Sequence, residues 1–179
     1  MPEAHFAVVI GTGFAFSHFD TGRRICVVEG GEFTPFDVMN VIDTEMWLNE
    51  EPRGRRAAEK MISGKYLWKN IWLQRQRQSA GESSPEPYSE NLIPILSQQH
   101  DLLTIAAVRR SGTLVGSMLK SFCPQDTNDP IRIIADGTVI QSLPEIRLSI
   151  EKALDPHPVI LILQHDAAIY GSAKAALSS

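Results

Sequence analysis

Apolar residues alternate with small or polar ones near the start of the chain, a pattern typical of strands. The run His5–Ile10 keeps its largest side chains on one side and ends at a pair of glycines. Two more short apolar runs follow at 14–19 and 24–28, and the residues between them at 20–22, Asp-Thr-Gly, favour a turn. The first 28 residues therefore predict a meander of three strands.

The middle of the chain changes to helical spacing. Residues 59–76 place Met61, Trp68 and Trp72 on one stripe, which predicts a helix. The segment 77–91 is rich in Ser, Pro, Glu and Gly and predicts an exposed loop. A second set of apolar residues and one glycine recurs every three or four residues, which predicts a long helix with one buried face. We expect the glycine, Gly112, to mark a close approach to a neighbouring element. The members of this set are Ile105, Val108, Gly112, Val115 and Leu119.

The last third alternates element types. A β-branched run at 131–134 predicts a strand that leads into Asp136-Gly137-Thr138. Ser142 and Glu145 have the spacing of a capping box, which predicts a helix over 145–154.

Two further elements complete the predicted order. The continuous apolar run 158–163 predicts a strand that is buried on both faces. Small residues over 167–177 predict a closing helix. The order β-β-β-α-α-β-α-β-α implies a mixed sheet with helices on both faces, an α/β domain of the ribonuclease H-like or actin-like ATPase type.

Composition supports one globular domain. The chain has 179 residues, of which 43% are hydrophobic and 21% charged, enough apolar surface for a core. A net charge of −4 gives no basic field for nucleic acid or an anionic membrane. No apolar run approaches the roughly 18 residues of a membrane helix, and the N-terminus lacks the basic start of a signal peptide. These features predict a cytoplasmic protein.

Charge and metal-binding residue types add little chemistry. Residues 1–52 carry nine acidic and two basic side chains, while 53–77 carry eight basic and one acidic. The basic run indicates either a solvated helix face or, second, a surface that faces phosphate. The two cysteines and five histidines show no CxxC or HxxxH spacing, so no metal site is predicted.

Candidate chemistry lies at the ends of the predicted elements. Gly11-Thr12-Gly13 ends the first strand, where it either makes a simple turn or brings backbone amides and a hydroxyl to a phosphate. Glu29 ends the third strand beside two glycines, and Glu59 opens the first helix. A carboxylate at an element end suits the recognition of sugar hydroxyls, whereas Glu59 also suits an interaction with the helix dipole.

Four segments together resemble the hexokinase family. They are VIGTG at 9–13, VEGGEF at 28–33, EKMISGKYL at 59–67 and ADGTVI at 135–140. EKMISGKYL is the most specific of them, and the resemblance runs from about residue 5 to the end of the chain.

The resemblance implies a sugar kinase of the actin-like ATPase superfamily that transfers the γ-phosphoryl group of MgATP to a hexose. Glu29 and Glu59 would contact the sugar. The residues implied at the nucleotide are Gly11, Thr12, Gly13, Gly64, Lys65, Asp136, Gly137 and Thr138.

Three departures qualify the resemblance. Ala15 stands where the family carries an asparagine that helps to hold the sugar. Residues 166–173 keep only part of the family's final adenosine motif. The family's first phosphate motif and its general-base aspartate should precede residue 1, and Asp20, Asp37 and Asp43 lie too late in the chain to replace that base.

The chain therefore resembles the large C-terminal domain of a hexokinase, over residues 1–179, without the small N-terminal domain. We expect this domain to be inactive alone, and to associate with the missing half or with itself. The alternatives are a non-catalytic module that binds sugar or nucleotide for regulation, and a stable protein without function.

Overall fold

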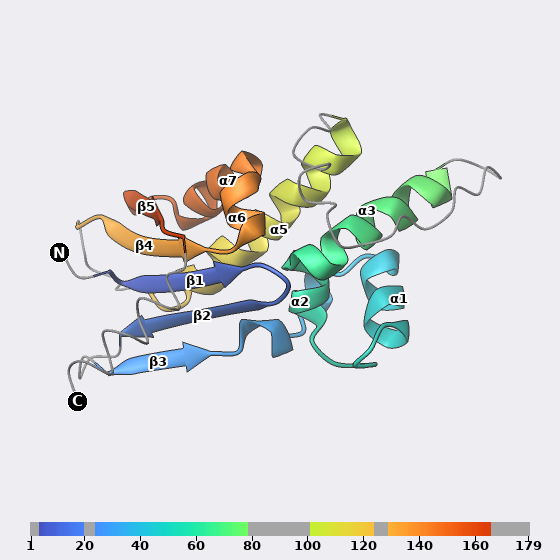
Figure 1. Ribbon diagram of the computed structural model, residues 1–179, viewed down its shortest axis with the longest axis horizontal. Coiled ribbons are helices and arrows are strands. Elements are labelled where there is room, and N and C mark those ends of the chain that lie inside the picture. The colour runs from blue at the N-terminus through green and yellow to red at the C-terminus, as the bar shows by residue number, and fades with distance from the viewer. Residues whose placement is uncertain (1–3, 20–23, 79–100, 124–128, 166–179) are drawn as a thin grey trace.

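Five strands form one mixed sheet in the order β3-β2-β1-β4-β5 (Figure 1). The computed structural model describes residues 4–19, 24–78, 101–123 and 129–165. The strands are β1 (Phe6–Ile10), β2 (Phe14–Phe19), β3 (Ile25–Val28), β4 (Ile131–Asp136) and β5 (Val159–Leu163). The α/β class and the mixed sheet expected from the sequence are confirmed.

Strand pairing brings the predicted turns to one edge of the sheet. β1 pairs antiparallel with β2, with Phe6 opposite His18, and parallel with β4, with Phe6 opposite Ile133. β2 pairs antiparallel with β3, and β4 pairs parallel with β5. Because β1 and β4 run in the same direction, the glycine turns that follow them lie at the same end of these strands, on the right in Figure 1.

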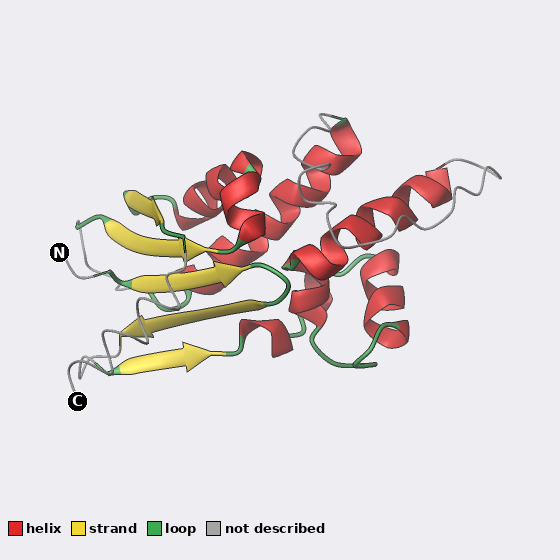
Figure 2. Cartoon of the chain, viewed as in Figure 1, coloured by secondary structure: helices red, strands yellow, loops and turns green. Residues whose placement is uncertain are grey.

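Helices occupy the space beyond that edge and beside one face of the sheet (Figures 1 and 2). Two short 3-10 helices follow β3, η1 (Gly30–Glu32) and η2 (Phe36–Val38). The α-helices are α1 (Val41–Asn49), α2 (Ala57–Ile62), α3 (Gly64–Gln78), α5 (Leu102–Lys120), α6 (Thr138–Ser142) and α7 (Pro144–Leu154). Alternate residues of β1, Phe6, Val8 and Ile10, bury against this helical layer in the main core.

The predicted helix over 59–76 is wrong in one respect, because it is two helices. α2 ends at Ile62 and α3 begins at Gly64, with Ser63 in an extended conformation between them. The amide of Gly64 donates to the carbonyl of Gly11 at 2.7 Å instead of continuing the helix. The break therefore ties the start of α3 to the end of β1.

Glycines set the packing of α5 against α7. A Cβ added at Gly112 would lie 2.5 Å from the carbonyl oxygen of Ile146, and one at Gly116 would lie 2.6 Å from the Cβ of Ala153. Backbone approach this close excludes any side chain at these two positions without a shift of α7. The close approach predicted at Gly112 is confirmed.

The capping box predicted at Ser142 and Glu145 is wrong. Leu143 is the N-cap of α7, no side chain caps it, and Pro144 occupies the first helical position, where its missing amide costs nothing. Glu145 instead forms an ion pair with Arg109 of α5 at 2.8 Å.

The strand predicted over 158–163 forms, but it is not buried on both faces. β5 lies at the edge of the sheet, with Ile160 and Ile162 exposed to 40% and 43%. A continuous apolar run does not distinguish a central strand from an edge strand. Of the other predicted elements, the closing helix and most of the loop at 77–91 lie outside the described residues; residues 77 and 78 end α3. No helix among the described residues has the length and hydropathy needed to cross a membrane.

Candidate functional site

Three segments predicted to carry chemistry meet where β1 ends. Within the first, the amide of Gly11 donates to the carbonyl of Gly13 at 3.1 Å, which closes the Gly11–Gly13 turn. Gly64 at the start of α3 binds the same turn through its amide. Gly137, after β4, has φ +102°, and a Cβ there would lie 2.4 Å from the carbonyl oxygen of Ile10. Only glycine allows this contact, so the two strand ends and α3 form one continuous backbone surface.

Glu59 lies against this surface. It sits in the first turn of α2, and its side chain is 13% exposed. Cβ atoms added at Gly13 and Gly31 would lie 3.4 Å and 3.1 Å from its Oε2 atom. The carboxylate therefore fills the space that these two glycines leave open, between the Gly11–Gly13 turn and η1.

Glu29 occupies a more open position. It precedes η1 as the N-cap residue, without a side-chain cap hydrogen bond, and is exposed. Gly31, two residues later, lies beside Glu59: a Cβ added at Gly31 would lie 3.0 Å from the Cβ of Glu59. The structure thus brings the VEGGEF and EKMISGKYL segments together through Gly31 and Glu59.

The remaining predicted nucleotide residues lie around the same edge. The carboxylate of Asp136 accepts hydrogen bonds from the amide of Gly137 at 2.6 Å and from Gln141 Nε2 at 3.0 Å, which shapes the turn into α6. Lys65 is exposed, with its Nζ 4.9 Å from the ring centre of Tyr66. Thr12 and Thr138 are exposed in the two turns.

Arg56 joins Glu59 to a second carboxylate, that of Glu32. Arg56 Nε lies 3.2 Å from Glu32 Oε1, and its Nη1 lies 3.5 Å from Glu59 Oε1. Arg55 Nη2 also contacts Glu32 Oε1 at 3.2 Å. Two interactions raise the pKa of Arg56: the larger is its hydrogen bond to Glu32, and the second is the negative charge of Glu59. The sequence analysis did not identify Arg56.

Lys60 was also missed, and its role is structural. It is buried, and its ammonium donates to the carbonyls of Glu50 and Pro52 at 2.7 Å and of Trp47 at 3.3 Å. Burial lowers the pKa of Lys60. Glu59 and Lys60 thus point to different partners, the first to the glycine turns and the second to the chain between α1 and α2.

A buried ion pair connects three helices behind the site. Asp43 of α1 accepts from both terminal nitrogens of Arg110 at 2.7 Å and 2.8 Å, and from Asn70 Nδ2 at 2.7 Å. Asp43 also completes a capping box with Asn40. The Asn40-to-Asp43 spacing is the sequence signal that would have located α1.

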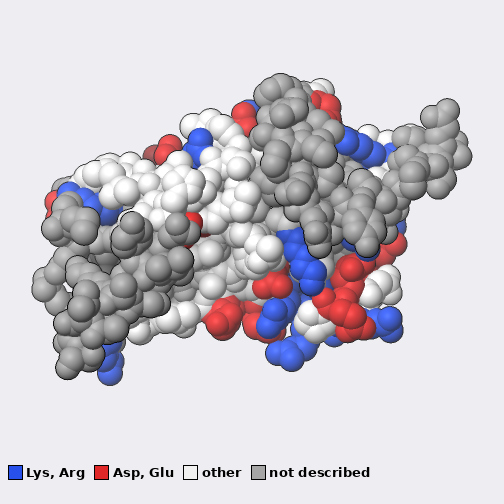
Figure 3. Space-filling view, in the orientation of Figure 1, with Lys and Arg blue, Asp and Glu red and all other residues white. Residues whose placement is uncertain are grey.

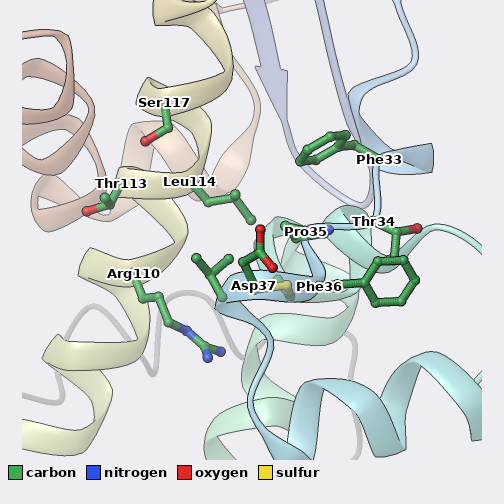
Figure 4. Close-up of a pocket in the computed structure, with 11 residues that line it drawn as sticks. Phe33, Thr34, Pro35, Phe36, Asp37, Arg110, Thr113, Leu114 and Ser117 are labelled. Atoms are coloured by element: carbon green, nitrogen blue, oxygen red, sulfur yellow. The ribbon is translucent and has the colours of Figure 1, made fainter.

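A hollow of about 440 Å³ lies beside the site, between η2 and α5 (Figure 4). Phe33 and Leu114 lie on opposite sides in the view of Figure 4, with Asp37 between them and Arg110 below Leu114. A second hollow of similar volume shares Phe33 and Leu114 and extends to Glu29. Both are lined mainly by apolar side chains. The polar chemistry lies instead at the glycine turns, so we place the candidate site there, with Glu29 at the boundary.

Ion pairs explain the uneven charge of the chain. Acidic residues of the first segment pair with basic residues of the second: Glu32 with Arg55 and Arg56, Glu45 with Arg77, Glu50 with Lys69, and Glu51 with Arg53. Figure 3 shows acidic and basic side chains interspersed on this part of the surface. Much of the basic run therefore pairs within the molecule. The described residues contain no group of three or more His, Cys, Asp or Glu side chains suited to a metal ion.

Comparison with solved structures identifies the fold. No protein-family model matches the sequence, and no curated protein sequence matches it. A hexokinase from Schistosoma mansoni complexed with glucose matches with a TM-score of 0.73 and 17% identity, over 99% of this chain and 54% of that one.

Two ROK-family structures also match. A glucokinase from Streptomyces griseus in complex with glucose and AMPPNP has a TM-score of 0.55 and 17% identity, over 91% of this chain and 57% of that one. A transcriptional regulator has a TM-score of 0.57 and 16% identity, over 88% and 41%. This chain spans about half the length of these proteins. The resemblance expected from the sequence is thereby confirmed at the level of the fold: the chain shares its α/β fold with these hexokinase and ROK-family structures.

Proposed function

We propose that this chain is the large-domain half of a hexokinase-type sugar kinase. It would bind a hexose and MgATP and support transfer of the γ-phosphoryl group to a sugar hydroxyl. The observation that carries the proposal is that the Gly11–Gly13 turn, Gly64 and Gly137 meet at the carboxyl ends of β1 and β4, with Glu59 beside them. Ligands of parallel α/β sheets bind at the carboxyl ends of the strands, which is where these residues meet.

Each group has a role that its chemistry suits. Glu59 Oε2 would accept hydrogen bonds from sugar hydroxyls, with Glu29 as a second acceptor. The amides of Thr12 and Gly13 and the hydroxyl of Thr12 would bind phosphate oxygens. Gly64, Lys65 and the turn Asp136–Thr138 would line the nucleotide. Mg²⁺ would enter with the nucleotide and neutralise the charge that develops on the phosphoryl group.

The chain alone would bind but not turn over its substrates. We propose that the general-base aspartate comes from a second, N-terminal half, since the matched kinases are about twice as long. Closure of the two halves would exclude water from the reacting groups. Ala15, on β2, removes one polar partner for the sugar, which weakens hexose binding by roughly 1–3 kcal/mol.

Calorimetry with glucose and with MgATP tests the proposal. We expect weak binding of both ligands to the wild-type chain. Glu59→Gln should abolish glucose binding and leave ATP binding intact, whereas Thr12→Val should weaken ATP binding about tenfold, the loss of one hydrogen bond to a charged group. Glu151→Gln, an exposed glutamate of α7, is the matched control.

Catalysis is tested by complementation. Phosphorylation of glucose should appear when the N-terminal half of a hexokinase is added to this chain, and should require Glu59. The absence of heat with both ligands, together with no phosphorylation of any hexose in the complemented mixture, would refute the proposal.

A regulatory module that binds sugar or nucleotide without catalysis is the second candidate. The matched ROK-family transcriptional regulator favours it, because that protein shares the fold and its name describes regulation rather than catalysis. Ligand binding without phosphorylation in the complemented mixture would select this candidate.

A further inference from the structure

Arg56 occupies a strained backbone position beside the candidate sugar site. Its φ is +55°, in the left-handed region, which makes it the one non-glycine residue with a positive φ among those the structure describes. A residue with a side chain is strained there, and such strain persists where neighbouring contacts hold it. Its carbonyl accepts from the amide of Lys60 at 3.1 Å, and its guanidinium makes the side-chain contacts.

The guanidinium bridges two carboxylates from different elements. Nε donates to Glu32 of η1, and Nη1 lies 3.5 Å from Oε1 of Glu59 in α2. The two oxygens of Glu59 thereby differ. Oε1 faces Arg56, whereas Oε2 is the atom beside Gly13 and Gly31.

This geometry orients a carboxylate that is otherwise held by packing against Gly13 and Gly31. Among the described residues, the ion pair of the Glu59 carboxylate is the one with Arg56. With Oε1 paired, rotation about the last side-chain bond is restricted and Oε2 stays at the glycine surface. A preoriented acceptor loses less conformational entropy when it binds a hydroxyl.

We propose that Arg56 is a positioning residue of the sugar site: it anchors Glu59 to Glu32 and holds Glu59 Oε2 toward the bound hexose. The proposal rests on the proposed function, because it assumes that Glu59 contacts the sugar. Arg55 gives an internal comparison, since it binds the same oxygen of Glu32 and forms no ion pair with Glu59.

The first measurement does not depend on sugar. In protein labelled with ¹³C-glutamate, the Cδ resonance of Glu59 at pH 7 reports the surroundings of its carboxylate. Arg56→Asn keeps a residue that tolerates the left-handed conformation but is too short to reach Glu59. We expect this variant to move the Glu59 resonance, and the control Arg55→Asn to leave it in place.

The second measurement is glucose affinity by calorimetry. Arg56→Asn should weaken glucose binding ~5- to 10-fold without changing MgATP affinity, while Arg55→Asn should change glucose affinity less than ~2-fold. Retained helical circular dichroism in both variants excludes unfolding as the cause.

The outcomes separate the two proposals. A Glu59 resonance unmoved by Arg56→Asn, or wild-type glucose affinity in that variant, overturns the positioning role. A wild-type chain that binds no hexose overturns the proposed function instead, and the resonance then still shows whether Arg56 holds Glu59.

Discussion

Neighbouring residues of one short segment serve opposite sides of the molecule. From Arg56 to Lys60 the chain makes the first turn of α2, so Arg56 and Glu59 lie on one side and Lys60 on another. Glu59 faces the glycine turns, and Lys60 binds three backbone carbonyls between α1 and α2. Lys60 therefore stabilises the segment that carries Glu59.

Replacing Lys60 by methionine tests this role. The substitution keeps the buried volume but removes the lysine donor from the carbonyls of Trp47, Glu50 and Pro52. The carbonyls of Trp47 and Pro52 still accept from the amides of Gly54 and Arg55. We expect a loss of about 2–4 kcal/mol in the free energy of unfolding, measured by urea denaturation. Lys65→Met, at an exposed position, should change it by less than about 0.5 kcal/mol. Equal stabilities of the two variants would contradict the role.

Asp101 makes stability depend on pH. Burial opposes its ionisation, but hydrogen bonds from the hydroxyl and amide of Thr104 and the charge of Arg75 outweigh this and lower the pKa of Asp101. A carboxyl with a lowered folded-state pKa contributes stability above its unfolded pKa and loses it as the pH falls through the folded value. We therefore expect the melting temperature to fall from about pH 5 downward, since unfolded Asp titrates near 3.9.

Asp101→Asn separates charge from capping. Asparagine is as good an N-cap as aspartate, so the variant should keep α5 capped at neutral pH and lose less stability in acid than the wild type. Asp101→Ala should cost about 1 kcal/mol at pH 7, because the cap is lost as well. If the melting temperatures of the wild type and Asp101→Asn fall equally between pH 5 and pH 3, a group other than Asp101 causes the pH dependence.

At the scale of elements, α5 and α7 pack at the distance that glycine permits. The backbone of α7 at Ile146 comes close to Gly112, and at Ile150 it comes close to Gly116. Such contact aligns α7 with α5 and so sets where α6 and the turn Asp136–Thr138 begin. The packing of these two helices therefore helps to position one part of the candidate site.

Gly112→Ala tests this packing. The added methyl group would lie 2.5 Å from a backbone oxygen, so α7 must shift. Overpacking outweighs the gain in helix propensity, and we expect a net loss of about 2 kcal/mol in the free energy of unfolding. Ser117→Ala, at an exposed position of the same helix, should change it by at most about 0.5 kcal/mol. A stabilised Gly112→Ala variant would show that the helices can separate freely.

For the whole molecule, the face of the sheet opposite the core cluster exposes apolar residues. Strand pairing places Val27, Val9 and Ile162 on this face, with Val27 69% exposed. β3, which carries Val27, is also an edge strand. An exposed apolar edge favours association with another chain.

We therefore expect the isolated chain to self-associate, as the sequence also predicts. Light scattering after size-exclusion chromatography should give a mass above 19.9 kDa that rises with concentration. Val27→Lys should shift the population toward the monomer, because charge on an edge strand opposes pairing. The matched control is Thr44→Lys, on an exposed position of α1. A wild-type chain that stays monomeric at high concentration would refute this expectation.

The sequence predicted the strands and the glycine turns better than the helices. Alternation of apolar residues in β1 reports burial directly, and a glycine pair after a strand reports a turn. The break at Ser63 escaped prediction because the apolar stripe continues across it, and the capping box of α7 failed because Pro144 already begins the helix. The role of Arg56 depends on a left-handed backbone and on Glu32, neither of which spacing reveals.

The parallel pairing of β1 with β4 fixes an order of assembly during synthesis. β2 and β3 follow β1 closely in the chain, and Glu59 and Gly64 can reach the Gly11–Gly13 turn once about 65 residues have emerged. β4, by contrast, places Ile133 opposite Phe6, a separation of 127 residues. Until then one side of β1 remains an unpaired edge on the nascent chain. Gly137 closes against Ile10 only after β4 has paired, so Glu59 and Gly64 would reach the Gly11–Gly13 turn early and the turn Asp136–Thr138 would join them late.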